Sequence, residues 1–304
     1  MPASNVQIQL NRIFHPSDFS EASNLAFAHA LKLAVGAQAR LTILHTDGAR
    51  KTDTWAEFPR VRSLLEKWEL LPTGSAPQDI VGLGLDVEKV VLPYSEPARS
   101  IVRYLHRHPH DLIVLATHHH EGLKRWFHES VAEPIARDSA ELSLFLPDDA
   151  AGFVNPSDGS ITLRNILIPV DAVPDPQVSV YGAVALAETL ECANIAATLL
   201  HIGDEKTFPK CFLPVSPAVQ WKKKYAKGPV ADAILNAAAD SQADLLVMST
   251  QGRNGFLDAL RGSTTERVLR KSKCPVLAVP AYRAGEPVVS TIEALATGKL
   301  NVAL

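Results

Sequence analysis

The chain has 304 residues, of which 46% are hydrophobic and 21% are charged, and its formal net charge is −3. This composition is that of an ordinary globular protein with room for two domains of about 150 residues each. A charge so close to zero gives no reason to expect nucleic acid or an anionic membrane as a partner. We find no apolar run long enough to span a membrane and no apolar signal-peptide core at the start.

The three cysteines, Cys192, Cys211 and Cys274, follow neither a metal-binding nor a redox spacing. Their odd number also argues against a framework of disulfides. We therefore expect free thiols and a location in the reducing cytoplasm.

In chain order, the first expected strand, Ile13–Asp18, has a counterpart at Ile166–Asp171, and both end in Pro-x-Asp. A helical spacing of apolar residues follows each strand, at Glu21–Leu33 and at Val178–Leu190. The chain therefore starts the same order of elements twice, which predicts an internal repeat.

The later elements continue this repeat. Second strands are expected at Leu41–Thr46 and Ala197–Ile202, where His45 and His201 occupy matching positions, which favours a structural role for both. The difference in residue number falls from 156 at the second strands to 133 at the fourth, so the first half holds 23 more residues between them. The further strands are expected at Val87–Leu92, Asp111–Thr117 and Leu142–Leu146 in the first half, and near Gln220–Ala226, at Asp244–Thr250 and at Val276–Val279 in the second.

Strands that alternate with helices indicate a parallel sheet covered on both faces. We predict an α/β protein of two repeated, doubly wound, Rossmann-like domains, in residues 1–150 and 151–304. Residues 147–163 are rich in turn-forming types and are expected to be the linker, and residues 282–304 follow the last strand as a tail. In such folds ligands lie at the carboxyl ends of the strands.

One stretch of the second half has the chemistry of a phosphate site. The apolar strand Leu245–Met248 runs into Gly252 and Gly255, and Gly262 then precedes Ser263 at an expected helix start. Glycines allow backbone N–H groups to approach an anion, and a helix N-terminus adds unpaired donors and a favourable dipole. The stretch is neither a Walker A loop nor a dinucleotide-binding fingerprint, and a capped helix without a ligand remains an alternative.

The spacing Ser249-x2-Gly252-x9-Gly262-Ser263 resembles the nucleotide motif of the universal stress proteins, Gly-x2-Gly-x9-Gly-Ser/Thr, with serine in place of the first glycine. The resemblance covers nearly all of both halves. It implies a tandem, UspA-like protein of adenine nucleotide alpha hydrolase-like domains, which binds ATP with magnesium in stress response or regulation. It also implies that the fifth strands of the two halves pair antiparallel within the chain, and it leaves a homodimer open.

The same resemblance assigns a site in the second half. Asp171 faces the nucleoside, Ile202 and Met248 flank the base, and the glycine loop holds the phosphates. Two alternatives stay open: Asp171 caps the following turn, and Ile202 and Met248 belong only to the core. The complete set of nucleotide-binding residues is Pro169, Asp171, Ile202, Met248, Ser249, Gly252, Gly255, Gly262 and Ser263.

Basic residues near this loop are ambiguous. Arg253, Arg261 and the run Lys222–Lys224 offer charge that neutralises phosphate. A lysine run is also typical of a solvated face.

The matching positions of the first half lack the loop chemistry. They are Ala116, His119, Gly122, Glu129 and Ser130. Glu129 would place a carboxylate against a phosphate, and like charges at close range repel. We expect no triphosphate in this half, which then serves as a scaffold or a regulatory partner.

Two other classes of function remain open. An enzyme, such as a weak ATPase or a nucleotidyl transferase, would need a nucleophile–base pair, and the second half offers none, so we expect at most slow hydrolysis. A nucleotide-free module that binds a metal or a partner is the other. Two histidine clusters motivate it, namely His106, His108 and His110, and His118–His120. Their alternative is a solvated loop, and we assign no catalytic or metal-binding residue.

Overall fold

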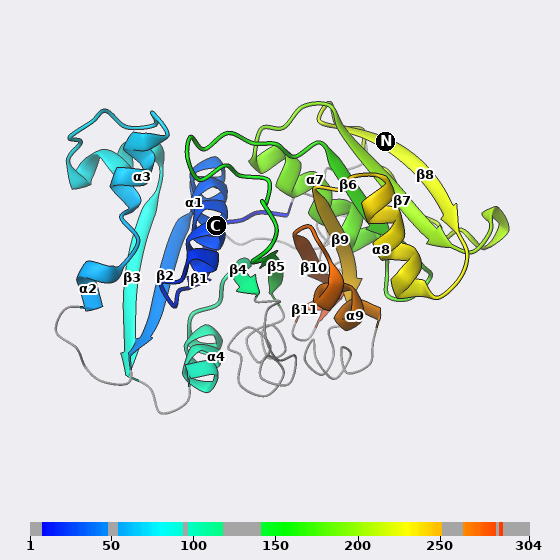
Figure 1. Ribbon diagram of the computed structural model, residues 1–304, viewed down its shortest axis with the longest axis horizontal. Helices are drawn as coiled ribbons and strands as arrows, with labels where there is room; N and C mark the ends of the chain where they lie inside the picture. The colour runs from blue at the N-terminus through cyan, green and yellow to red at the C-terminus, as the bar shows by residue number, and fades with distance from the viewer. Residues whose placement is uncertain are drawn as a thin grey trace, which may run out of the picture.

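The computed structural model describes residues 8–47, 54–93, 97–117, 141–250, 264–283 and 286–287. Within them, ten strands form one sheet in the order β3-β2-β1-β4-β5-β10-β9-β6-β7-β8 (Figure 1). The strands are β1 (Arg12–Pro16), β2 (Arg40–Asp47), β3 (Asp86–Pro93), β4 (Leu112–Thr117), β5 (Leu142–Pro147), β6 (Asn165–Pro169), β7 (Ile195–Ile202), β8 (Val219–Ala226), β9 (Leu245–Thr250) and β10 (Val276–Pro280). A short ribbon, β11 (Tyr282–Arg283) with β12 (Glu286–Pro287), follows them.

The helices lie between these strands. They are α1 (Glu21–Ala37), α2 (Thr54–Glu57), α3 (Val61–Lys67), α4 (Pro97–Arg107), α7 (Gln177–Thr189), α8 (Val230–Asp240) and α9 (Thr264–Lys271), with short 3-10 turns η1 (Pro77–Leu83) and η2 (Glu205–Thr207). Each expected strand, and each helix expected in the described part of the chain, is present at its predicted position, within a few residues at its ends. The predicted α/β class is confirmed.

The two halves of the sheet have the same strand order and meet at one antiparallel pair. β5 and β10 pair there, with Phe145 opposite Val276 and Ser143 opposite Ala278. The other described neighbours within this sheet are parallel. The predicted pairing of the two fifth strands is confirmed, and it covers a sheet edge that each half would otherwise expose.

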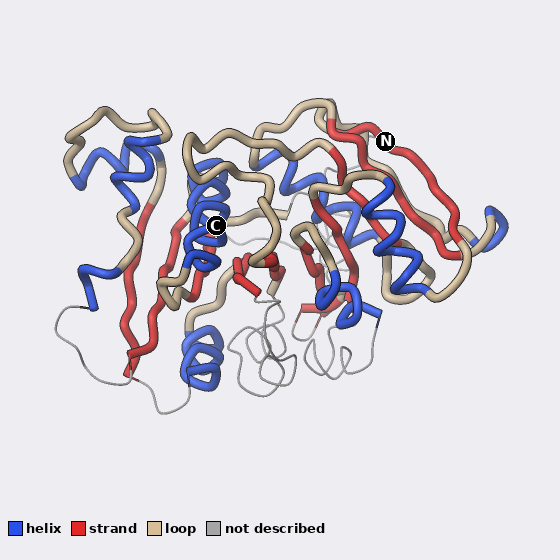
Figure 2. The backbone as a smooth tube through the Cα atoms, in the orientation of Figure 1, coloured by secondary structure: helices blue, strands red, loops and turns tan. Residues whose placement is uncertain are grey.

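Helices cover both faces of the sheet (Figure 2). α1 and α7 pack on one face and also contact each other, whereas α4, α8 and α9 pack on the other. The cluster under α1 and α7 includes residues of both halves, so the core on this face is continuous across the chain. At the contact, Gly36 of α1 lies so close to α7 that a Cβ atom would stand 2.1 Å from the carbonyl oxygen of Thr189.

The repeat extends to individual hydrogen bonds. In the first half, the Asp111 carboxylate accepts the N–H groups of Asn11 and Arg12, each at 2.9 Å. In the second half, the Asp244 carboxylate accepts the N–H groups of Arg164 and Asn165, each at 2.8 Å. Each aspartate thus ties the start of the fourth strand to the start of the first. Both aspartates are half-buried and precede the fourth strands, at the end of the sheet opposite the carboxyl ends of the strands, so their role is structural.

The extra residues of the first half lie between its second and third strands. β2 ends at Asp47 and β3 begins at Asp86, whereas β7 ends at Ile202 and β8 begins at Val219. The longer connection contains α2, α3 and η1. It is the blue and cyan region beside β3 in Figure 1.

The segment expected to be a plain linker is partly core. Phe153 and Val154 are buried, and a bridge between Val154 and Ile161 closes a small turn. The Nε2 atom of His29 accepts the N–H groups of Phe153 and Val154, at 2.9 and 3.1 Å. Trp68 donates its Nε1–H to the carbonyl of Pro156 in the same turn at 3.2 Å. The segment is therefore fastened to the first half by side chains far away in sequence.

Candidate functional site

The expected nucleotide site is at a point where the strand order reverses. From β6 the chain proceeds outward to β7 and β8, whereas β9, the other neighbour of β6, leads to β10. The chain therefore leaves the carboxyl ends of β6 and β9 in opposite directions along the sheet. In open α/β sheets ligands bind at such switch points. Pro169 ends β6, and Met248, Ser249 and Thr250 end β9.

Asp171 follows β6 with its side chain exposed. One carboxylate oxygen accepts the N–H of the next residue, Ala172, at 2.7 Å. The carboxylate thus supports the turn, as one of the two alternatives predicts. No other hydrogen bond of this group is found among the described residues, so the second oxygen is available to a ligand.

The two residues expected beside the base lie on one face of the sheet. Met248 is buried, Ile202 is half-buried, and both belong to the cluster beneath α8 and α9. Met248 packs within this cluster, while Ile202 keeps part of its surface accessible. Ser249 is half-buried, and the buried hydroxyl of Thr250 has no partner within the described part of the chain.

The phosphate part of the site lies outside the described residues. This applies to Gly252, Gly255, Gly262 and Ser263 and to the two nearby arginines. The helix expected to begin there is α9, whose first described residue is Thr264, directly after Ser263. Glu266, in its first turn, is buried and forms an ion pair with Arg270 at 2.8 Å.

In the first half, three buried polar side chains from β1, the turn after it and the start of α1 form a line of hydrogen bonds. The Nδ1–H of His15 donates to the carbonyl of Val114 at 3.0 Å, its Nε2 lies 3.3 Å from the Ser23 hydroxyl, and Ser23 lies 2.9 Å from the Ser17 hydroxyl. Burial lowers the pKa of His15 to about 4, so the ring is neutral at pH 7. The second half has Ile168, Pro176 and Val170 at these positions.

The sequence alone shows that the two halves differ at these positions, because their first strands align residue by residue. The aligned pairs alone did not reveal that the three polar side chains bond to one another. Of the first-half counterparts of the glycine loop, Ala116 is at the half-buried end of β4, and the others lie outside the described residues.

The paired histidines have the structural role that their repetition predicts. His45 Nδ1 lies 2.7 Å from the carbonyl oxygen of Ser17, and His201 Nδ1 lies 3.1 Å from that of Val170. Both carbonyls follow the first strand of their half. Each ring therefore connects the end of the second strand to the turn that carries the Pro-x-Asp pattern of its half.

The lysine run lies on β8, the last strand at one end of the sheet. The three lysines pair with the middle of β7. Their strand, β8, is the second strand away from β6. Charged side chains, lysine above all, protect an exposed edge from pairing with another chain. The solvated-face alternative therefore fits the run, which does not lie at the carboxyl ends of the central strands.

Metal-binding chemistry is not assembled in the described residues, where no three His, Cys, Asp or Glu side chains converge. His108 stacks on Tyr104, and His110 is buried with its Nε2 3.2 Å from the Thr42 hydroxyl, so these two rings serve different contacts. His118–His120 lie outside the described residues. All three cysteines are free, as expected. No described helix meets the length and hydropathy needed to cross a membrane.

Comparison with known proteins places this arrangement in a family. The model of the universal stress protein family matches residues 10–140 and 213–280, which is more than half of the chain. The chain belongs to the universal stress protein family. The resemblance drawn from the glycine motif is therefore confirmed at the level of the family.

Individual proteins are similar to parts or most of this chain. A universal stress protein of Methanocaldococcus jannaschii, MJ0531, is 43% identical over 53 residues, which span 17% of this chain and 31% of that protein. The crystal structure of a universal stress protein from Archaeoglobus fulgidus superposes with a TM-score of 0.58 at 17% identity, covering 91% of this chain and 98% of its own. A shorter universal stress protein, solved in complex with cAMP, covers 46% of this chain and 98% of its own, at 16% identity and a TM-score of 0.36.

Proposed function

We propose that the protein binds ATP, with magnesium, in its second half and acts as a nucleotide-dependent stress or regulatory protein. The observation that carries the proposal is the position of Asp171 and Ser249 at the ends of two adjacent strands where the order reverses. The glycine loop continues directly from the second of these strands. An exposed carboxylate on one side and a glycine loop on the other suit the two ends of a nucleotide.

The proposal gives the remaining residues the following roles. Pro169 shapes the turn before Asp171, and Ile202 and Met248 form the apolar side of the base site. Gly252, Gly255, Gly262 and Ser263 hold the phosphates through backbone N–H groups and a hydroxyl.

We propose domains at residues 1–150 and 151–304, with the first half free of triphosphate because Glu129 replaces a loop glycine. Binding rather than turnover is the proposed activity. No nucleophile–base pair is found among the described residues at the carboxyl ends of β6 and β9, and the hydrogen-bonded pair of Thr207 and His201 belongs to the connection between β7 and β8. A cytoplasmic location fits three unpaired thiols.

The test is a calorimetric titration of ATP and magnesium into the wild type and a Gly262→Glu variant, which copies Glu129 into the second half. We expect one ATP per chain in the wild type and none in the variant. Gly82→Glu is the matched control, because a Cβ atom at Gly82 meets nothing within 4 Å. Two ATP per chain would contradict the argument from Glu129, and no binding to the wild type would overturn the proposed function.

A further inference from the structure

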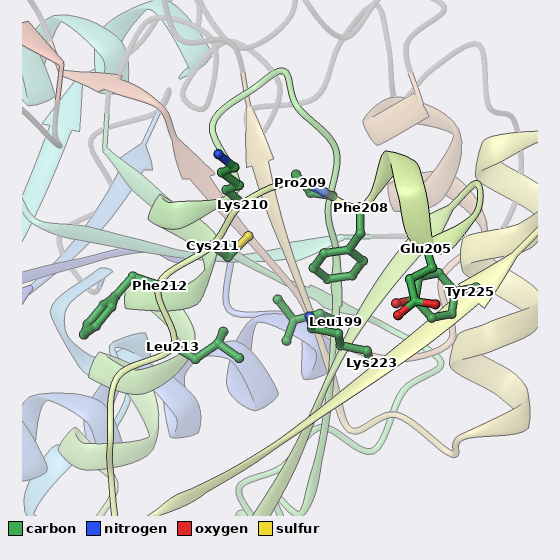
Figure 3. A pocket seen from close by; sticks show the side chains of 10 residues that line it. All are labelled: Leu199, Glu205, Phe208, Pro209, Lys210, Cys211, Phe212, Leu213, Lys223 and Tyr225. Atoms are coloured by element: carbon green, nitrogen blue, oxygen red, sulfur yellow. The ribbon is translucent and has the colours of Figure 1, made fainter.

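A cavity of about 600 Å³ lies in the second half, beneath the connection between β7 and β8 (Figure 3). Its floor comes from these two strands, and its cover is the segment 205–213. The lining residues are Leu199, Glu205, Phe208, Pro209, Lys210, Cys211, Phe212, Leu213, Lys223 and Tyr225. The volume falls within the range of sites for small organic ligands.

The cavity is separate from the proposed nucleotide site. Side chains alternate between the two faces of a strand, so Leu199 and Ile202 point to opposite faces of β7. Leu199 belongs to the cluster beneath α7, whereas Ile202 and Met248 pack beneath α8 and α9. A molecule in the cavity therefore lies on the α7 face of the sheet.

The first half has the same lysine–phenylalanine pair, but its phenylalanine is more deeply buried. There, Lys89 Nζ lies 5.5 Å from the ring centroid of Phe58, just as Lys223 Nζ lies 4.5 Å from that of Phe208. Phe58 is only 2% exposed, because the longer connection with α2 and α3 surrounds it. The ring of Phe19 also meets it edge to face, with the two ring centroids 5.4 Å apart.

The second half lacks both the long connection and the phenylalanine that bury Phe58 in the first half. Its connection is shorter, and Ala172 stands where the first half has Phe19. Phe208, the counterpart of Phe58, is half-buried, and Phe212 and Tyr225 in the same lining are 53% and 39% exposed. Such exposed aromatic surface around a hollow marks a binding site more often than a random patch does.

The walls of the cavity are held in place without a ligand. Gln177 of α7 donates its side-chain N–H to the carbonyl of Phe212 at 2.9 Å and accepts the N–H of Phe212 at 2.8 Å. Thr207 bonds to His201 at 2.9 Å at the other end of the cover. Binding to such a preformed wall costs little ordering entropy.

The chemistry of the lining defines the ligand. Phe208 and Tyr225 meet edge to face, with centroids 5.9 Å apart, and so present ring surfaces at an angle. Lys223 extends beneath the Phe208 ring and has no ion-pair partner among the residues that the structure describes. Lys210 adds a second cation, and the carboxylates nearby are Glu205 in the lining and Asp175, whose charge contributes to the raised pKa of Cys211. We propose that this cavity binds a small planar aromatic molecule that carries one anionic group, with Lys223 as its counter-charge.

The experiment is a fluorescence titration of the full chain with anilinonaphthalene sulfonate, an aromatic anion, in parallel with neutral N-phenyl naphthylamine. We expect saturable binding of the anion at one site and weaker binding of the neutral compound. Lys223→Met should weaken binding of the anion about tenfold, whereas Lys222→Met, a change of the neighbouring lysine that faces the other side of β8, should leave it unchanged. Phe212→Ala, at an exposed position, should weaken both compounds.

Two measurements locate the binding site. Burial raises the pKa of Cys211 to about 11, so its alkylation by iodoacetamide is followed at alkaline pH by peptide mass spectrometry. The aromatic anion should slow alkylation of Cys211 and leave Cys192 unaffected, and an excess of ATP with magnesium should not displace it.

Three results would overturn the proposal. They are equal affinity in the Lys223 and Lys222 variants, displacement by ATP, and no protection of Cys211. Because ATP binding is measured separately, failure here is distinct from failure of the nucleotide proposal.

Discussion

His29 connects the first half to the segment that leads into the second, and its removal tests how much this fastening contributes. Its Nδ1–H donates to the Leu25 carbonyl at 2.9 Å, so Nε2 must be the acceptor for the N–H groups of Phe153 and Val154. The ring is fully buried and meets Phe153 edge to face at 4.6 Å. Gly152, with φ of +70°, lies so close that a Cβ atom would stand 2.4 Å from the ring.

The perturbation is His29→Leu, which keeps much of the volume and removes the acceptor. Two buried N–H groups then lose their partner, and each costs about 1–3 kcal/mol of unfolding free energy. We expect a total loss of about 2–6 kcal/mol, measured as a lower midpoint in urea unfolding at pH 7. The control is His108→Leu, at an exposed position where only the stacking on Tyr104 is lost, with a change of at most about 1.5 kcal/mol.

The pH dependence of stability separates this role from simple packing. Burial lowers the pKa of His29 to about 4. The unfolded chain, with a pKa near 6.5, then binds a proton between pH 6.5 and 4 that the folded chain does not. The stabilisation by His29 is therefore complete above pH 6.5 and is lost, by about 1.4 kcal/mol per pH unit, as the pH falls towards 4.

His15 and His110, whose pKa values burial also lowers to about 4, contribute in the same direction. The His29→Leu variant should consequently keep a shallower, but not flat, loss of stability in acid. Identical pH dependence in the variant and the wild type, or a loss below about 1 kcal/mol at pH 7, would refute the reasoning.

Further predictions concern the contact of the halves, the strand ties and the site. Gly36→Ala should lower the unfolding free energy by at least about 2 kcal/mol, because its Cβ would meet the Thr189 carbonyl at 2.1 Å; Gly82→Ala, in open space, is the comparison in the same urea assay. Asp244→Ala leaves two strand N–H groups without their acceptor and should cost about 2–4 kcal/mol, and a near-neutral result would contradict a role in tying the strands. Asp171→Ala should weaken ATP about tenfold in calorimetry with little change in unfolding, and unchanged affinity would remove Asp171 from the site.

The fold follows closely from local pattern. Apolar runs, helical spacing and turn residues mark nearly every element of both halves, including the weakly marked strand that became β8. This works because the periodicities of buried strands and helices are properties of neighbouring residues. The site follows less completely from the sequence. The ends of β6 and β9 lie together as the topology requires, whereas the roles of the glycine-loop residues stay predictions.

The sequence by itself determined the repeat, the family and the strand that carries the glycine motif, because each depends on residue types at fixed spacing. Only the tertiary structure decided which distant side chains meet. It placed Phe153 of the linker against His29, placed the lysine run on the edge strand β8, and formed the cavity between β7, β8 and the segment 205–213. These features depend on contacts between residues far apart in the chain, and such contacts have no signature in local spacing.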